Sequence, residues 1–201
     1  LYALSFLRGV LVSERGRELA MNAATVADTL DRVMFERYGD IQLFAKDGLL
    51  RDGTQPQQTA RLLDYKQLYQ YYSWLGVADE SGQLLAATDT LPAQDTQGLN
   101  PESFELVRRT GQIHFEDMRP SSTSQRTMAI GFTAPIYGPK GEFRGVVATR
   151  VPFENLQPIF EQEGRLRYGT LAYDWLLLDR EGTLLSEKER PSNLNSSPVK
   201  V

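Results

Sequence analysis

Residues 127–151 read TMAIGFTAPIYGPKGEFRGVVATRV and carry the strongest β pattern in the chain. Apolar residues alternate through Met128, Ile130 and Phe132, which places them on one face of a strand. The middle of the segment, PIYGPKGEFRG, is rich in the glycine and proline of turns. The last part, GVVATRV, is again strand-like. We therefore predict a β-hairpin over 127–151.

A second hairpin is predicted upstream, where residues 74–88 read WLGVADESGQLLAAT. Two apolar stretches flank a tight Asp-Glu-Ser-Gly turn, a combination typical of strand, turn and strand. Gly82 suits the left-handed backbone conformation that such a turn requires.

A helix and a further strand are predicted between the two hairpins. In NPESFELVRRTG (100–111), the first residue is a good N-cap, the proline follows at the first helical position and the final glycine stops the helix. The next segment, QIHFEDM (112–118), reads as a strand. Residues 74–151 are thus predicted to form a five-stranded antiparallel sheet with a helical insert.

A long amphipathic helix is predicted over 13–45, which contains no proline. Its apolar residues recur in steps of three and four, as on one stripe of a helix. At about 50 Å the helix is much longer than a compact module of this size. The stripe allows it to run beside two modules or to pair with the same helix of another chain. Residues 1–12 fit the cut end of a transmembrane helix or the start of a packed helix, whereas 47–59 is predicted to be loop.

The turn motif D-x-x-G-x-L-L occurs twice, as DESGQLL (79–85) and DREGTLL (179–185). A tryptophan precedes each copy, at Trp74 and Trp175. The same hairpin used twice at this spacing indicates two stacked copies of one module.

The ordered series of these features resembles the double Cache family of bacterial extracytoplasmic sensor domains. The matching segments are the long helix, the two hairpins, the linker PFENLQPIF and the second WLLLDREGTLL. The resemblance implies an α+β fold: a long N-terminal helix and a PAS-like five-stranded antiparallel sheet module, followed by a partial second PAS-like module. It divides the chain into a signalling or dimerisation helix (1–46), a membrane-distal module (47–151), a connecting helix (152–166) and the start of a membrane-proximal module (167–201).

Composition and motifs argue against catalysis and nucleic-acid binding. The chain has no cysteine, one histidine and a formal net charge of −4, so thiolate metal sites and histidine triads are excluded. No Lys/Arg cluster offers an electrostatic footprint for nucleic acid. Neither a phosphate-binding glycine loop nor a G-x-S-x-G motif is present. We expect no enzyme activity in this chain and no cofactor.

The resemblance implies a ligand pocket on one face of the first sheet, under the region 89–126. The amino-acid-binding branch of the family carries R-x-W-Y near residue 100, where this chain has LNPESFEL. It also carries an aspartate after G-V-V, where this chain has Arg150. Arginine prefers carboxylate or phosphate partners. We therefore expect a small carboxylate or other small anion as ligand; the alternative for Arg150 is a salt bridge to a carboxylate such as Asp117.

The other expected ligand-binding residues combine aromatic walls with polar groups, as small-molecule pockets do; they are Tyr72, Trp74, Asp89, Asp117, Arg119, Arg126 and Thr133. For Trp74 the alternative is core packing, and for Arg119 and Arg126 a solvated loop. The single histidine, His114, is expected to be structural.

The function that the resemblance implies is that of a small-molecule-sensing domain of a membrane-bound bacterial signal transducer. Such a protein is a sensor histidine kinase, a chemoreceptor or a cyclic-di-GMP enzyme of the inner membrane. The domain faces the periplasm between two flanking transmembrane helices, and the chain is a candidate homodimer through its N-terminal helix. The alternatives are a ligand-free structural or dimerisation module and a cytosolic PAS-type protein.

Overall fold

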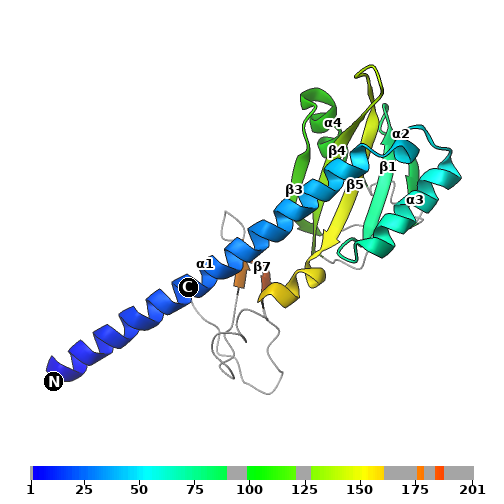
Figure 1. Cartoon of the computed structure of the whole chain (residues 1–201). Coiled ribbons are helices and arrows are strands. Elements are labelled where there is room, and N and C mark those ends of the chain that lie inside the picture. Colours follow the sequence, from blue (N-terminus) through cyan, green and yellow to red (C-terminus); the bar gives the residue numbers. More distant parts are fainter. Residues whose placement is uncertain (1, 90–98, 121–127, 161–175, 179–183, 188–201) are drawn as a thin grey trace.

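The computed structural model describes residues 2–89, 99–120, 128–160, 176–178 and 184–187. Its main sheet contains β1 (Trp74–Asp79), β2 (Leu84–Ala87), β3 (His114–Pro120), β4 (Met128–Tyr137) and β5 (Phe143–Pro152). These five strands lie in the order β2-β1-β5-β4-β3, and every neighbouring pair is antiparallel. The predicted five-stranded antiparallel sheet and the α+β class are therefore confirmed (Figure 1).

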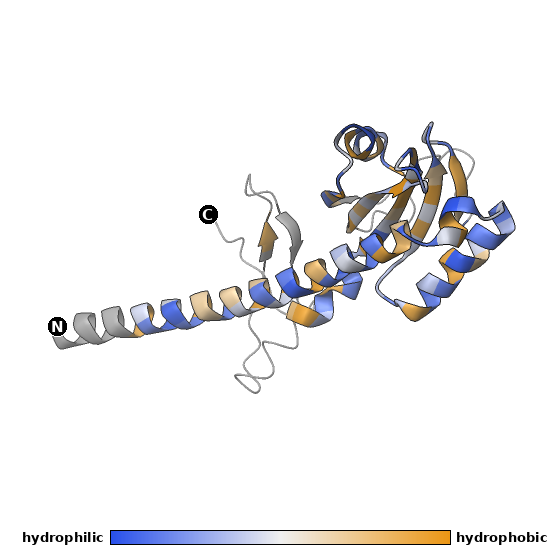
Figure 2. Ribbon diagram, turned by 45° about the horizontal axis from the view of Figure 1, so that its top comes forward, coloured by the Kyte–Doolittle hydropathy of each residue, from blue (hydrophilic) through white to orange (hydrophobic). Residues whose placement is uncertain are grey.

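Both faces of this sheet are covered, so most residues of the two interior strands β4 and β5 are buried. On one face, here called the α1 face, Leu75, Val147 and Phe132 pack into the larger core with residues of the long helix. On the other, the α4 face, Trp74 and Ala148 join a smaller core. Hydrophobic residues are concentrated in these strands, as Figure 2 shows.

The long helix α1 (Tyr2–Ala45) has 44 residues, so it begins eleven positions earlier than the predicted 13–45 helix. At 1.5 Å per residue it is about 66 Å long. Its C-terminal end packs on the sheet, where Ile41 and Phe44 are fully buried. Its N-terminal part projects away from the sheet (Figure 1), and Leu11 and Val12 are exposed. No described helix is both long and apolar enough to cross a membrane.

The prediction of a loop over 47–59 was wrong, because two helices occupy most of it. Helix α2 (Gly48–Asp52) is capped by Asp47, whose side chain accepts a hydrogen bond from the Leu49 amide. Helix α3 (Gln55–Leu68) starts with a capping box between Thr54 and Gln57. The Asp-Gly and Pro signals in this segment are helix caps, which share their residue types with turns.

Helix α4 (Pro101–Thr110) has the predicted bounds and caps. Asn100 is the N-cap, and its Oδ1 accepts a hydrogen bond from the Glu102 amide at 2.9 Å. Gly111 ends the helix with a left-handed φ of 67°, a conformation that favours glycine. Phe104 and Val107 are buried against the sheet, so α4 covers the face opposite α1.

The second D-x-x-G hairpin repeats the register of the first. In the first, Gly76, Val77 and Ala78 pair with Ala87, Ala86 and Leu84. In the second, β6 (Leu176–Leu178) pairs with β7 (Leu184–Glu187) through Leu176–Glu187, Leu177–Ser186 and Leu178–Leu184. Each pair is shifted by 100 positions, and both ladders break at the same step. This agreement is what two copies of one hairpin would produce.

Of the segment predicted to connect the modules (152–166), the structure describes only the first part. It contains a 3-10 turn, η1 (Phe153–Asn155), and a helical stretch over 157–160. Pro158 lies in the first turn of this helical stretch, where proline is well tolerated. The rest of this segment lies outside the described residues.

The turn between β1 and β2 depends on Asp79. One carboxylate oxygen, Oδ1, accepts hydrogen bonds from the Ser81 amide, the Ser81 hydroxyl and the Gln83 amide. Partial burial alone would raise the pKa of Asp79, but these bonds favour the charged form and the net effect is a lowered pKa. Since the folded-state pKa lies below the unfolded value, the stabilisation is present above that value and is lost as the pH falls through the folded pKa.

We expect Asp79→Ala to lower the free energy of unfolding by about 1–2 kcal/mol at pH 7, because the turn loses its hydrogen-bond acceptor. Urea denaturation at pH 7 and at pH 3 measures the effect. The difference between variant and wild type should shrink at pH 3; a difference that stays constant with pH would contradict the role assigned to the carboxylate. Glu80→Ala, in the same turn with an exposed side chain, is the control.

Candidate functional site

A row of four residues crosses the α4 face of the sheet. Register places Trp74 of β1 opposite Arg150 of β5, Arg150 opposite Gly131 of β4, and Gly131 opposite Glu116 of β3. Residues directly opposite one another in antiparallel strands point to the same face. Trp74, Arg150 and Glu116 therefore share one face although they come from three strands.

Arg150 and Glu116 form a buried ion pair. Their side chains are 11% and 8% exposed, and Arg150 Nη2 lies 3.2 Å from Glu116 Oε1. Arg150 Nη1 also donates to the carbonyl oxygen of Thr149 at 3.0 Å. Burial lowers the pKa of Arg150 below its usual value, and the Glu116 carboxylate offsets part of that effect. The site thus holds a cation whose main charged partner belongs to the protein itself.

Gly131 makes this pair possible. A Cβ atom at this position would lie 2.3 Å from Arg150 Nη1 and 3.1 Å from Glu116 Cδ. The two charged side chains meet over the glycine backbone, which lies between their strands. A larger residue would have to push them apart.

Glu116 also contacts the helix that covers this face. Its second carboxylate oxygen, Oε2, accepts a hydrogen bond from Asn100 Nδ2 at 3.3 Å. Asn100 is the N-cap of α4, so one carboxylate joins Arg150 in the middle of the sheet to the first turn of the helix above it.

Four buried polar atoms on this face have no hydrogen-bond partner among the described residues: Trp74 Nε1, Ser103 Oγ, Thr133 Oγ1 and Glu116 Oε1. Glu116 Oε1 contacts Arg150 as an ion pair without hydrogen-bond geometry. Thr133 is fully buried and Ser103 is 1% exposed. Buried polar groups are normally satisfied, so the three atoms without any partner, on Trp74, Ser103 and Thr133, are hydrogen-bonding groups that remain available between the sheet and α4.

The structure brings together three of the expected ligand-binding residues: Arg150, Trp74 and Thr133. Arg150 does form the salt bridge that was considered as its alternative role, but with Glu116 and not with Asp117. Asp117 is exposed and points away, because adjacent residues of a strand face opposite sides.

Two other expected residues lie away from this group. Tyr72 is buried in the core of the α1 face, where its hydroxyl donates to Asp40 Oδ2 at 2.9 Å. Asp89 is exposed and forms an ion pair with Lys66 of α3 at 2.7 Å. Of Arg119 only the backbone is described, and Arg126 lies outside the described residues.

The sequence alone did not indicate Glu116, Asn100 or Ser103 as site residues. Strand alternation puts Glu116 on the same face as His114, but only the register of β3 against β4 shows which residues it meets. Asn100 was predicted to be an N-cap, a role that uses its Oδ1 as a hydrogen-bond acceptor. That role gives no information about the partner of its side-chain Nδ2. Ser103 has no distinctive signal in the sequence.

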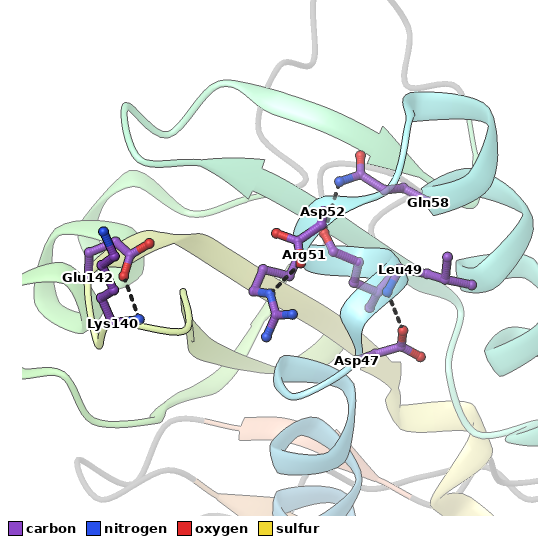
Figure 3. Close-up of polar contacts among 8 residues, drawn as sticks. Asp47, Leu49, Arg51, Asp52, Gln58, Lys140 and Glu142 are labelled. Carbon is purple, nitrogen blue, oxygen red and sulfur yellow. Dashed lines mark hydrogen bonds and ion pairs between the residues drawn. The ribbon is translucent and has the colours of Figure 1, made fainter.

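An open cleft of about 420 Å³ lies elsewhere, between α2, α3, the β1–β2 turn and the start of β5. Its lining includes Arg51, Gln58 and the exposed Arg144. Arg51 is paired with Asp52 at 2.7 Å, and Gln58 donates to the Leu50 carbonyl oxygen at 2.8 Å, as Figure 3 shows. These polar groups of the cleft are partnered or solvent-exposed, whereas Trp74 Nε1 and Thr133 Oγ1 on the α4 face are buried without a partner among the described residues. The α4 face is therefore the better candidate site.

No protein-family model matches the chain, and no curated protein sequence matches it. Solved structures do. The sensor domain of the Vibrio cholerae histidine kinase DctB is similar with a TM-score of 0.59 at 16% identity, over 72% of this chain and 58% of that domain. The chain has the Cache fold. The DctB domain and the two similar domains that follow are sensor or ligand-binding domains of this Cache type.

Two further solved structures are similar to this chain. The ligand-binding domain of the Pseudomonas fluorescens chemoreceptor CtaA, in complex with L-serine, has a TM-score of 0.59 at 13% identity, over 80% of this chain and 66% of that domain. The Escherichia coli DcuS sensor domain has a TM-score of 0.53 at 15% identity, over 65% of this chain and 96% of that domain. The Cache chain thus spans 58–66% of the first two domains and matches almost all of the third.

Proposed function

We propose that this Cache chain is the ligand-sensing part of a membrane-bound bacterial signal transducer. The proteins with the same fold are described as sensor domains of histidine kinases and as ligand-binding domains of chemoreceptors. Within the chain, the observation that carries the proposal is the group of three buried polar atoms between the sheet and α4, Trp74 Nε1, Ser103 Oγ and Thr133 Oγ1, that have no partner among the described residues. A purely structural module would be expected to have apolar side chains at these buried positions.

The proposed ligand is a small carboxylate or another small anion. Arg150 supplies a guanidinium fork that matches a planar carboxylate, and its side chain lies on the same face as the unpartnered Trp74 Nε1 and Thr133 Oγ1. An indole N–H can only donate, so it suits a ligand acceptor oxygen. A hydroxyl can accept or donate and would orient the remaining groups of the ligand.

The proposed signal output passes through α1. The C-terminal end of this helix packs on β4 and β5, the strands that carry Gly131 and Arg150. Ligand binding transmits a signal only when two arrangements of helix and sheet bind the ligand unequally. In the proposed full-length protein, transmembrane helices flank the domain, the domain faces the periplasm across the inner membrane, and α1 pairs with its copy in a homodimer.

A melting-temperature screen tests the proposed function. A ligand at 100 times its dissociation constant stabilises the folded state by about 2.7 kcal/mol, which shifts the melting temperature by several degrees. We expect such a shift from at least one of acetate, succinate, citrate and phosphate, and none from the uncharged amide succinamide. A ligand-free structural module predicts no shift with any compound, and tight binding of zwitterionic amino acids without binding of organic acids would contradict the proposed ligand class.

A further inference from the structure

Glu116 occupies the position in which a ligand carboxylate would meet Arg150. Its Oε1 is 3.2 Å from Arg150 Nη2, and both side chains are nearly buried. The pair is formally neutral, so an anionic ligand that joined it without displacing Glu116 would add a second negative charge beside the first. Like charges in a poorly solvated site repel strongly.

The contact between Glu116 and Arg150 is also one that a ligand could replace. It lacks hydrogen-bond geometry, and Glu116 Oε1 has no other partner among the described residues. A ligand carboxylate with good geometry on the guanidinium would make a stronger, charge-assisted contact. Glu116 lies on β3, one of the two edge strands of the sheet, and the pairing of β3 with β4 is irregular just after Glu116. An edge strand with a broken ladder can adjust more readily than a central one.

The same carboxylate bonds the N-cap of the covering helix, through Asn100 Nδ2 and Glu116 Oε2. Asn100 in turn accepts from the Glu102 amide in the first turn of α4. Movement of Glu116 away from Arg150 would therefore change the contact that holds the start of α4 over the sheet.

We propose that Glu116 is an internal competitor for the ligand: it pairs with Arg150 and the α4 N-cap in the ligand-free protein, and a small anion displaces it. This inference rests on the proposed function, because it concerns the same site. Displacement of Glu116 would couple occupation of Arg150 to the position of α4. It also predicts a weakened affinity in the wild-type protein, since the ligand must first break a pair within the protein.

Calorimetric titration with succinate and acetate tests this competition. Glu116→Gln keeps the size of the side chain and a hydrogen-bond acceptor for Asn100, but removes the competing charge. We expect it to bind the anions about tenfold more tightly than the wild type, equivalent to about 1.4 kcal/mol. Asp117→Asn is the matched control: it removes the same charge from the next residue, whose side chain is exposed, and its affinity should stay within about twofold of the wild type, as expected for exposed charges.

The outcomes separate the two proposals. If the wild type binds the anions and Glu116→Gln binds them equally or more weakly, Glu116 is not a competitor, and the sensing proposal stands. If only Glu116→Gln binds, the competition is supported in its strongest form. If neither protein binds any anion, the proposed ligand class fails and the competition fails with it.

A second measurement uses the wild-type protein, so it tests the proposal even if the Glu116→Gln variant misfolds. In a ¹H–¹⁵N correlation spectrum, the side-chain amide signals of Asn100 should shift saturably with succinate, because Nδ2 loses its bond to Glu116. Binding of succinate without any change of the Asn100 signals would overturn the proposal.

Discussion

Replacing Arg150 with methionine is expected to lower the free energy of unfolding by about 3–5 kcal/mol. The substitution removes the cation from a pair whose members are only 11% and 8% exposed, and leaves the Glu116 carboxylate buried without its charged partner. Removing one member of a buried ion pair is costly because the other charge stays desolvated. Urea denaturation followed by circular dichroism measures the loss.

Two controls separate this effect from lost packing. In the double variant Arg150→Met with Glu116→Leu, no charge is buried, so most of the stability should return. Arg144→Met, an exposed arginine on the same strand, should change stability by less than about 0.5 kcal/mol. A double variant no more stable than Arg150→Met would show that the guanidinium acts through packing alone.

Replacing Asp40 with alanine is expected to have a similar effect, of about 3–5 kcal/mol, at the junction of α1 with the sheet. Asp40 Oδ2 lies 2.8 Å from Arg37 Nε, and these side chains are 15% and 6% exposed. The same oxygen accepts the hydrogen bond of the Tyr72 hydroxyl. Without Asp40, the buried Arg37 guanidinium loses its closer ion-pair partner and the buried Tyr72 hydroxyl loses its hydrogen-bond acceptor. Urea denaturation measures the change.

Glu36→Ala is the matched control for this prediction. Glu36 also contacts Arg37, at 3.5 Å, but its side chain is 56% exposed. Exposed ion pairs contribute little, so we expect a change of at most about 1 kcal/mol. Equal losses in the two variants would contradict the importance assigned to the buried contact.

The Asp40 contact also bears on the proposed signal output, because hydrogen bonds link it to the backbone of Arg150. Tyr72 is followed by Ser73, whose amide donates to the Arg150 carbonyl oxygen at 2.9 Å. Hydrogen bonds and one peptide link therefore connect Arg150 with Asp40 of α1. A displacement of β5 at the candidate site would therefore be expected to shift Tyr72 and its hydrogen bond to Asp40 of α1.

Most of the fold follows from local sequence signals. Alternating apolar residues predicted the strands of the main sheet, and Asn100 and Gly111 predicted the ends of α4, because these caps act through their nearest neighbours. The error over 47–59 has a local cause as well: Asp47 and Thr54 are caps of α2 and α3, whereas the same residue types also occur in turns. The D-x-x-G repeat indicated one hairpin used twice, and the two hairpins have the same register 100 positions apart.

The candidate site was only half predictable, because it depends on pairing between distant strands. Arg150 stood out by its place after G-V-V, and Thr133 and Trp74 by their strands. That Glu116 meets Arg150 over Gly131 depends on the registers of β3 with β4 and β4 with β5. A slip of one residue would have put Asp117 on this face instead. Tyr72 packs toward α1. It precedes β1, and strand alternation predicts the direction of side chains only within a strand, so the face on which Tyr72 lies could not be predicted.

The central claim is that a small anion binds between the sheet and α4, and the indole N–H of Trp74 tests it most directly. Trp74 is 2% exposed, and its Nε1 has no hydrogen-bond partner among the described residues. Its ¹H–¹⁵N signal, assigned with the Trp175→Phe variant, can be followed during titration with acetate, succinate, citrate and phosphate. The account predicts that at least one anion moves the Trp74 signal saturably, and that Arg150→Lys weakens the response. A Trp74 signal unmoved by every anion, in a folded wild-type protein, would contradict it.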